Sequence, residues 1–435
     1  MNRDAQTVKL MKLLLAGDIH MGRASSRLPA SLPADETRAA RAWLRLVDVA
    51  VRRRVDVVCL SGDIADADNR FWEAIGPLEE GINRLSAAGI RTIAVAGNHD
   101  HDVLTRLARQ MDREAFTLLG EGGQWERVTL EQNGQAAVHL DGWSFPRRRV
   151  RNSPVESYTL DADATIPVLG MVHGDLDDAN SPYAPLDLVR LQGMAVDGWL
   201  LGHVHAPRLI EQTGRPWVLY PGSLQALDPG EPGTHGAWLI NVERGGLSVP
   251  ELLPLSSAFY NGCTVDLDGV DKPEDLETRL LEAIKREANA AAEAGGEALR
   301  AISLRLTLAG RTTLARQARQ TAEAIVADLD LRIGQAMVGV DKLTIEALPP
   351  IDLAEHADSH TAPGALARLL LELDKPEPGE TVTQLIRQTR QALAEVDGHR
   401  DFANLASPTV TDDDVKAHLA HEARSLLTEL LSQTT

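Results

Sequence analysis

Five short segments of this 435-residue chain carry side chains that commonly bind metal ions. Each follows a run of apolar residues, and together they are Gly17-Asp18-Ile19-His20, Gly62-Asp63-Ile64-Ala65-Asp66, Gly97-Asn98-His99-Asp100, Val172-His173-Gly174-Asp175 and Gly202-His203-Val204-His205. The carboxyl ends of strands are where loops converge in an open α/β sheet. Any one of these segments could be an ordinary turn, but five in order predict a shared metal site.

The candidate ligands indicate the kind of metal chemistry. They are Asp18, His20, Asp63, Asn98, His173, His203 and His205. Imidazole, carboxylate and amide oxygen, without thiolate, suit manganese, iron or zinc better than a structural zinc site. Seven ligands are too many for one tetrahedral ion, and they suffice for two ions if one carboxylate bridges. Because paired ions catalyse in-line displacement at phosphorus, the residues predict a two-metal phosphoesterase.

The elements that must position these residues alternate between strands and helices. Apolar runs predict strands at residues 8–16, 55–60 and 90–96, and helical spacing predicts helices at 36–54 and about 70–88. Short strands separated by turns follow residue 116, which indicates a second sheet packed on the first. The fold class is therefore α/β, a two-sheet sandwich flanked by helices that ends near residue 255.

Two further parts are predicted beyond the sandwich. Residues 258–350 alternate strand and helix and should form a small α+β capping domain, after a first domain at 1–257. Residues 351–435 should form a helical tail. Its last helix opens with Thr411 followed by Asp412, Asp413 and Asp414, which resembles a capping box. The apolar stripe behind it either packs on its own domain or docks a partner: Val415, Leu419, Ala423, Leu426, Leu427 and Leu430.

The composition sets limits on location and partners. No apolar run reaches the ~20 residues that a membrane span requires, and Cys59 and Cys263 are expected to be reduced thiols in a cytoplasmic protein. The net charge of −19 weakens the case for a nucleic-acid ligand. Part of this excess of negative charge lies in residues 351–435, however, which contain seven basic and 15 acidic residues.

The ordered segments resemble the calcineurin-like metallophosphoesterase superfamily. Three later stretches narrow the resemblance: Leu201-Gly-His-Val-His-Ala-Pro207, Tyr220-Pro-Gly-Ser-Leu-Gln225 and Gly236-Ala-Trp-Leu239. They are similar to bacterial DNA double-strand-break-repair exonucleases of the SbcD and YhaO type, and to YhaO most of all. The resemblance covers roughly residues 11–255, and beyond that only the order of domains matches. It implies a metal-dependent DNA exonuclease or endonuclease, with manganese as the ion.

The resemblance also implies individual roles. Asp18, His20, Asp63 and His205 would hold one ion. Asp63, as the bridge, would hold the second together with Asn98, His173 and His203. His99 would protonate the leaving oxygen or stabilise the charged phosphate, and Asp100 would orient His99. Some relatives have a second histidine at the position of Asp66, so such a residue is not expected here.

DNA binding and partners complete the expectations. The basic run Arg147, Arg148, Arg149 and Arg151 could contact backbone phosphates, although such runs are often only solvated loops. The chain has no Gly-x-x-x-x-Gly-Lys-Ser/Thr loop for ATP. The resemblance implies an SMC-like ATPase of the YhaN or SbcC type as partner, and a homodimer. The alternatives are a phosphodiesterase for cyclic or free nucleotides and a non-catalytic scaffold for an ATPase.

Overall fold

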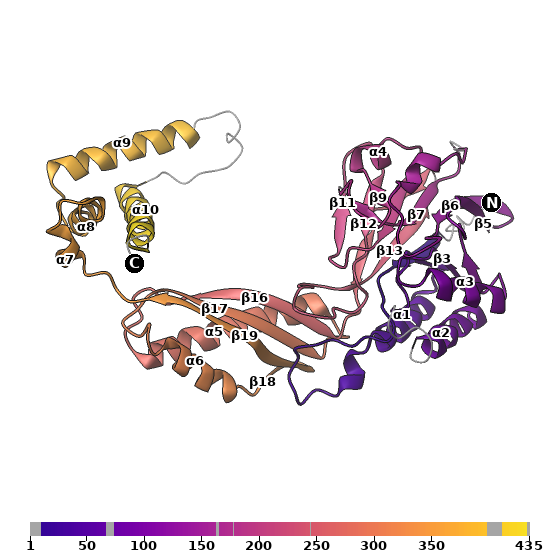
Figure 1. Ribbon diagram of the computed structural model, residues 1–435, viewed down its shortest axis with the longest axis horizontal. Coiled ribbons are helices and arrows are strands. Elements are labelled where there is room, and N and C mark those ends of the chain that lie inside the picture. The colour runs from indigo at the N-terminus through magenta and orange to yellow at the C-terminus, as the bar shows by residue number, and fades with distance from the viewer. Residues whose placement is uncertain are drawn as a thin grey trace, which may run out of the picture. The chain divides into compact units, whose positions relative to one another are not determined.

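The computed structural model describes residues 10–66, 74–161, 165–176, 178–243, 245–397 and 411–432. It forms two compact units, residues 1–347 and 348–435 (Figure 1). Among the described residues, no helix is both long and apolar enough to cross a membrane.

The first sheet of the larger unit is built around the first predicted strand, β1 (Met11–Ala16). Its order is β14-β13-β1-β2-β3-β4, with β15 paired to β13. The strands from β1 to β4 are parallel, whereas β13 pairs with β1 in the antiparallel direction. The other members are β2 (Val57–Leu60), β3 (Arg91–Ala94), β4 (Phe116–Leu118), β13 (Gly236–Glu243), β14 (Gly246–Leu247) and β15 (Glu251–Pro254).

A second sheet of six strands packs on the first, as predicted from the short strands after residue 116. Its order is β11-β12-β10-β7-β6-β5. These strands are β5 (Glu126–Gln132), β6 (Gln135–Trp143), β7 (Val168–His173), β10 (Gly198–Gly202), β11 (Arg208–Ile210) and β12 (Trp217–Tyr220). The short pair β8 (Asp175–Leu176) and β9 (Pro185–Leu186) lies beside it in the sequence and forms its own ladder.

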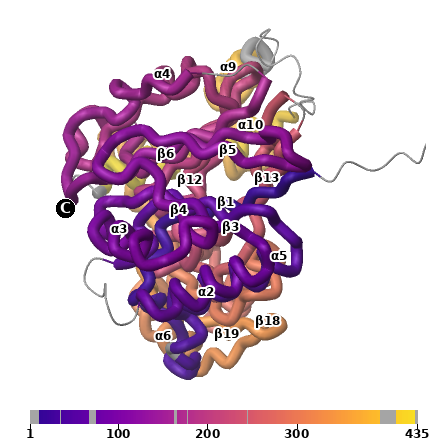
Figure 2. The backbone as a smooth tube through the Cα atoms, turned by 90° about the vertical axis from the view of Figure 1, so that its right-hand side faces the viewer, coloured from indigo at the N-terminus to yellow at the C-terminus, as the bar shows by residue number. Residues whose placement is uncertain are grey.

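Alternation of side chains along the strands produces the layers. Leu13 and Leu15 of β1 pack between the two sheets with Leu169 of β7, whereas Leu14 faces the helices on the other side. The outer face of the first sheet is covered by α1 (Ala39–Arg53), α2 (Ile75–Ala87) and α3 (His101–Gln110), and α4 (Leu188–Gln192) lies on the second. Figure 2 shows this succession from α4 through both sheets to α2. The two-sheet α/β sandwich is confirmed.

Two details of the sandwich concern its short and partly described segments. Short 3-10 helices, η1 (Ala34–Thr37) and η2 (Pro154–Ser157), lie in the loops. The helix expected from about residue 70 is described from Ile75 onward, because residues 67–73 lie outside the described part.

The small α+β domain follows the sandwich within the same unit. Its sheet has the order β16-β17-β19-β18, and α5 and α6 lie on one side of it (Figure 1). The elements are β16 (Ala258–Asp266), α5 (Pro273–Gly295), β17 (Ala301–Arg311), α6 (Ala318–Ala327), β18 (Leu331–Ile333) and β19 (Ala336–Leu348). The last strand, β19, spans 13 residues. A tight turn at Gly334 (φ 58°) pairs Ile333 with Ala336 in a hairpin.

The second unit is helical, as expected for the tail. It comprises α7 (Leu353–Ala357), α8 (Ala362–Leu373), α9 (Glu380–Asp397) and α10 (Asp412–Ser432). Thr411 and Asp414 form the predicted capping box, since the Asp414 N–H donates to Thr411 Oγ1 and the Thr411 N–H donates to Asp414 Oδ2. Val415 and Leu427 of α10 are buried against Leu370 of α8. The apolar stripe therefore packs largely on its own unit.

Candidate metal centre

The carboxyl ends of five strands bring all seven candidate ligands together. Asp18 and His20 follow β1, Asp63 follows β2, and Asn98 follows β3. His173 is the last residue of β7, and His203 and His205 directly follow β10. Since β7 and β10 belong to the second sheet, the site lies where the carboxyl edges of the two sheets meet. The convergence expected from the sequence therefore involves both layers.

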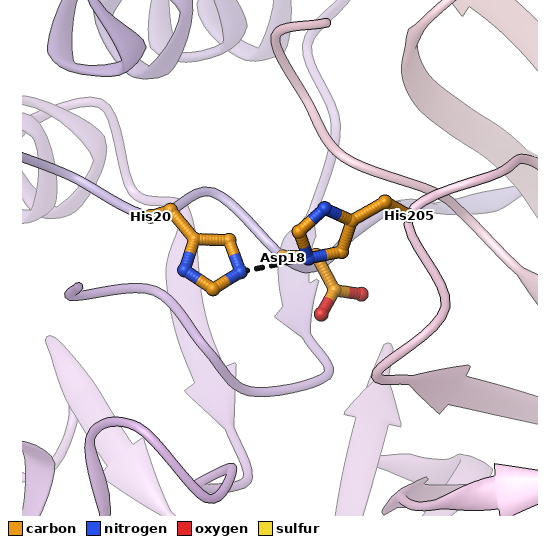
Figure 3. A group of neighbouring side chains, drawn as sticks. All are labelled: Asp18, His20 and His205. Atoms are coloured by element: carbon orange, nitrogen blue, oxygen red, sulfur yellow. Dashed lines mark hydrogen bonds between the residues drawn. The ribbon is translucent and has the colours of Figure 1, made fainter. Parts of the chain in front are cut away.

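Asp18, His20 and His205 form the first donor group (Figure 3). The Nε2 atoms of the two imidazoles are 3.0 Å apart, and Asp18 is fully buried beside them. Two nitrogens that each lie ~2.1 Å from one ion at tetrahedral angles are separated by about 3.4 Å. The two rings are thus placed almost as a shared cation requires, so the donor set fits a metal ion.

Asp63, His173 and His203 form the second donor group. Nε2 of His173 is 3.0 Å from Oδ1 of Asn98 and 3.4 Å from Oδ2 of Asp63, which adds the predicted asparagine to this group. Nδ1 of His173 hydrogen-bonds to the carbonyl of Ser61 at 3.0 Å. This bond fixes the ring and leaves Nε2 turned toward the other donors.

The electrostatics of the second group favour a cation. Burial disfavours a charge on His173, but the Asp63 carboxylate outweighs it and raises the pKa of His173 to about 9. Burial likewise opposes ionisation of Asp63, and His173 and His20 together hold the pKa of Asp63 well below its usual range. The buried carboxylates create a negative potential that attracts a proton in the metal-free protein. The same negative potential would attract a metal cation.

The backbone at the candidate ligands is held in an uncommon conformation. Asp18, His20, Asp63 and His203 have positive φ angles of 45°, 49°, 49° and 102°. Such residues cost on the order of 1–3 kcal/mol each and gather at functional sites. The surrounding contacts impose the conformation: the His20 N–H donates to the Asp63 carbonyl at 3.0 Å, and the His203 N–H donates to Asp18 Oδ1 at 3.0 Å.

Glycines in these segments allow the ligand-bearing loops to approach one another closely. A Cβ at Gly97 would lie 2.2 Å from Oδ1 of Asp63, and a Cβ at Gly202 would lie 2.2 Å from the carbonyl oxygen of Ser61. Both distances are far below van der Waals contact. Any larger residue at either position would push the ligand loops apart.

His99 lies at the rim of the centre and is outside the two main donor groups. Its side chain is 31% exposed, its ring centroid is 5.1 Å from that of His20, and its backbone N–H donates to Asp63 Oδ1. Burial lowers the pKa of His99, opposed by the charge of Asp63. The geometry therefore leaves this imidazole available to a ligand that approaches the centre from solvent.

Asp100 is used differently from the expected role of orienting His99. Its oxygens accept hydrogen bonds from the backbone N–H groups of Gly97 (2.8 Å) and Ile64 (2.6 Å), and the side chain is fully buried. Burial and the nearby Asp63 raise the pKa of Asp100 to about 7. These contacts tie the loop after β3 to the loop after β2. The carboxylate that faces the His99 ring is Asp66, at 3.9 Å from Nδ1.

Three carboxylates next to the histidines were not in the predicted set. Asp66 Oδ1 is 3.3 Å from His20 Nδ1, and the two residues form a third group of possible ligands with His99. Asp175 Oδ2 is 3.8 Å from His203 Nε2, and Glu231 Oε1 is 2.7 Å from His205 Nδ1. Asp66 and Asp175 lie in segments that the sequence had singled out. Glu231 lies in a separate loop with no ligand-like pattern around it.

The basic run lies on a segment connected to the centre. Arg147, Arg148, Arg149 and Arg151 are all exposed. Between them, Val150 pairs with Tyr183, whose ring centroid is 5.1 Å from that of His203. The arginines thus lie on a loop that pairs with Tyr183, and Tyr183 contacts the candidate ligand His203.

Comparison with known proteins agrees with this geometry. Residues 11–207 match the calcineurin-like phosphoesterase family, and residues 260–348 match the middle domain of the metallophosphoesterase YhaO. The chain is 28% identical to "Uncharacterized metallophosphoesterase YhaO" of Bacillus subtilis over 256 residues, which cover 54% of this chain and 58% of that protein.

Two further similarities extend the comparison. "DNA double-strand break repair protein Mre11" of Methanopyrus kandleri is 24% identical over 62% of each chain. The chain therefore aligns with about three fifths of the length of these curated relatives. Among solved structures, a dimetal phosphatase of Danio rerio is 14% identical with a TM-score of 0.35, over 53% of this chain and 92% of that one. On the family matches, residues 11–207 are similar to the calcineurin-like phosphoesterases and residues 260–348 to the YhaO middle domain.

Proposed function

We propose that this chain is a nuclease that hydrolyses DNA phosphodiesters in DNA repair, using two divalent ions, with manganese as the preferred ion. The observation that carries the proposal is the pair of adjacent donor groups, one around His20 and His205 and the other around His173 and His203. Asp63 is subject to the charges of both His173 and His20, which suits a bridging carboxylate.

The residues of the chain have distinct roles in this proposal. Asp18, His20, Asp63 and His205 would hold one ion, and Asp63, Asn98, His173 and His203 the other. When bound, the ions would activate a water molecule and polarise the phosphodiester. Asp100 holds the loops after β2 and β3 together through its backbone hydrogen bonds. His99, half-buried at the rim, is placed to donate a proton or hydrogen bond to the leaving oxygen.

DNA is favoured as the substrate by features around the centre. The exposed arginines at 147–149 and 151 offer cationic contacts beside the ligand His203, through the Val150–Tyr183 pairing. The small α+β domain packs on the sandwich, where Ser303 Oγ donates to the Arg27 carbonyl and the Tyr260 hydroxyl donates to the Ser26 carbonyl. A capping domain in this position suits a polymer better than a free nucleotide. The similarity to a DNA double-strand break repair protein points the same way.

A partner and a cellular setting form part of the same proposal. We infer an SMC-like ATPase as partner, in the cytoplasm, with a homodimer as the assembled form. In the helical unit, Leu371 and Leu426 are 36% and 47% exposed, although the adjacent Leu370 and Leu427 are buried. Leu426→Glu should abolish co-purification with the ATPase while the helical unit stays folded. Retained binding by this variant would remove α10 as the docking element.

One comparison tests the substrate assignment. With manganese, the unmodified protein should have a turnover rate on linear duplex DNA at least 100-fold higher than on cyclic nucleotides or a nitrophenyl phosphodiester. Asp63→Asn should be inactive on all three, which excludes a contaminating nuclease. Preference for a cyclic nucleotide would establish a small-molecule phosphodiesterase instead. Absence of turnover on every substrate, with both ions bound, would favour a scaffold.

A further inference from the structure

Glu231 is a buried carboxylate in the loop between β12 and β13, and it contacts a metal-centre histidine directly. Its Oε1 is 2.7 Å from Nδ1 of His205. Its Oε2 accepts hydrogen bonds from Ser223 Oγ at 2.7 Å and from the Leu227 N–H at 2.8 Å. The residue is only 6% exposed. A buried carboxylate with both oxygens engaged is fixed in position.

The loop that carries Glu231 is itself anchored on two sides. Gly233 N–H donates to the carbonyl of Tyr260 in β16, at 2.9 Å. On the other side, the Ser26 N–H donates to the Leu227 carbonyl at 2.9 Å, and Ser25 Oγ donates to the Ala226 carbonyl at 2.6 Å. The first strand of the small domain and the loop after β1 therefore both hold the loop in place.

We propose that Glu231 positions the imidazole of His205. It selects the tautomer of His205 that is protonated on Nδ1, and it thereby turns Nε2 of His205 toward the proposed metal site. The proposal rests on the two-metal centre proposed above. If Nδ1 carries the proton that Glu231 accepts, the lone pair of His205 is on Nε2. That nitrogen is the one 3.0 Å from Nε2 of His20. A carboxylate behind a ligand imidazole fixes the ring and increases its basicity, and its loss typically weakens metal binding.

Metal binding by the apo-protein tests the proposal without relying on catalysis. Titration calorimetry with Mn²⁺ should show that Glu231→Gln weakens one of two sites by about 10- to 100-fold. Glutamine cannot replace the carboxylate, because an amide that accepts from Leu227 N–H turns its NH₂ group toward His205.

The matched control is Asp228→Asn, which makes the same charge change in the same loop. Asp228 Oδ1 accepts from the Gly230 N–H, a contact away from the metal centre. The control should bind Mn²⁺ like the parent.

Unchanged Mn²⁺ affinity in Glu231→Gln would overturn the proposal. A second measurement needs no Glu231 variant, in case that variant does not fold. A long-range ¹H–¹⁵N spectrum of the apo-protein, with His205 assigned from the spectrum of His205→Asn, should show the proton of His205 on Nδ1. A proton on Nε2 alone would also overturn it. If the parent binds two Mn²⁺ ions and cleaves no DNA, the proposed function fails while this inference stands.

Discussion

The Nε2 atoms of His20 and His205 lie 3.0 Å apart, although the two residues are separated by 185 positions in the sequence. Behind each ring, a carboxylate faces Nδ1: Asp66 behind His20 at 3.3 Å and Glu231 behind His205 at 2.7 Å. Each imidazole is thus held at Nδ1 by a carboxylate, and the Nε2 atoms of the two rings point toward each other. This arrangement suits a site that is organised before any cation arrives.

Cation binding should stabilise the larger unit measurably. Mn²⁺ at 100 times its dissociation constant contributes about 2.7 kcal/mol to folding, which corresponds to a rise in Tm of roughly 4 °C for a unit of this size. Differential scanning calorimetry with and without chelator measures the shift. Asp63→Asn keeps an acceptor for the His99 N–H but removes the carboxylate, so most of the shift should vanish. An equal shift in this variant would contradict the assigned bridge.

His99→Ala should separate catalysis from metal binding. Because His99 is at the rim, its removal should lower the rate of DNA cleavage by about 10²–10⁴-fold and leave Mn²⁺ stoichiometry at two. Steady-state cleavage assays and calorimetry measure the two quantities. His101→Ala is the matched control, since His101 begins α3 two residues further along. It should keep nearly full activity. Full activity in His99→Ala would exclude His99 from the chemistry.

Loss of the basic run should weaken DNA binding chiefly at low salt. Each phosphate contact contributes about 0.9 to the slope of log affinity against log salt. Replacing Arg147, Arg148 and Arg149 with alanine should therefore lower the slope by up to about 2.7, as followed by fluorescence anisotropy. The control replaces Arg52, Arg53 and Arg54, which are also exposed and carry the same charge. Equal slopes in the two triple variants would show that only net charge matters.

The two thiols should be unreactive in the folded protein. Cys59 is fully buried, and burial raises the pKa of its thiol far above the usual range. Cys263 is partly buried, and burial together with Glu287 raises its pKa as well. Since the thiolate is the nucleophile, alkylation at pH 8 should be slow at both sites until denaturant is added. Mass spectrometry counts the modified thiols. Rapid labelling of Cys59 in the native protein would show that the sheet around β2 opens.

The seven candidate ligands could be located from the sequence because each lies at or just after the end of an apolar strand. Asp18 after β1 and His173 at the end of β7 are examples in which the strand alone fixes the location of the side chain. The role of Asp100 could not be found in this way. Adjacent residues of a chain point in different directions, and Asp100 faces the backbone of the neighbouring loop while His99 faces the centre.

Glu231 and the β18–β19 hairpin were missed for related reasons. Glu231 meets His205 through the folding of a long irregular loop, which leaves no periodic pattern in the sequence. The hairpin residues are half exposed, so the alternation of apolar and polar residues in β19 is weak. Local patterns therefore predicted the layers and the positions of the candidate ligands, whereas contacts between loops became visible only in the folded structure.

The left-handed backbone at Asp18, His20, Asp63 and His203 has a consequence for the protein in the cell. Glycine or asparagine would adopt these angles more readily, but glycine offers no donor atom. The chain thus retains strain that its hydrogen bonds hold in place, and a bound cation would offset part of it. When divalent ions are scarce, the apo-form should unfold more often and be degraded faster, since 1–2 kcal/mol can change abundance several-fold. Metal supply would then regulate the amount of this protein as well as its activity.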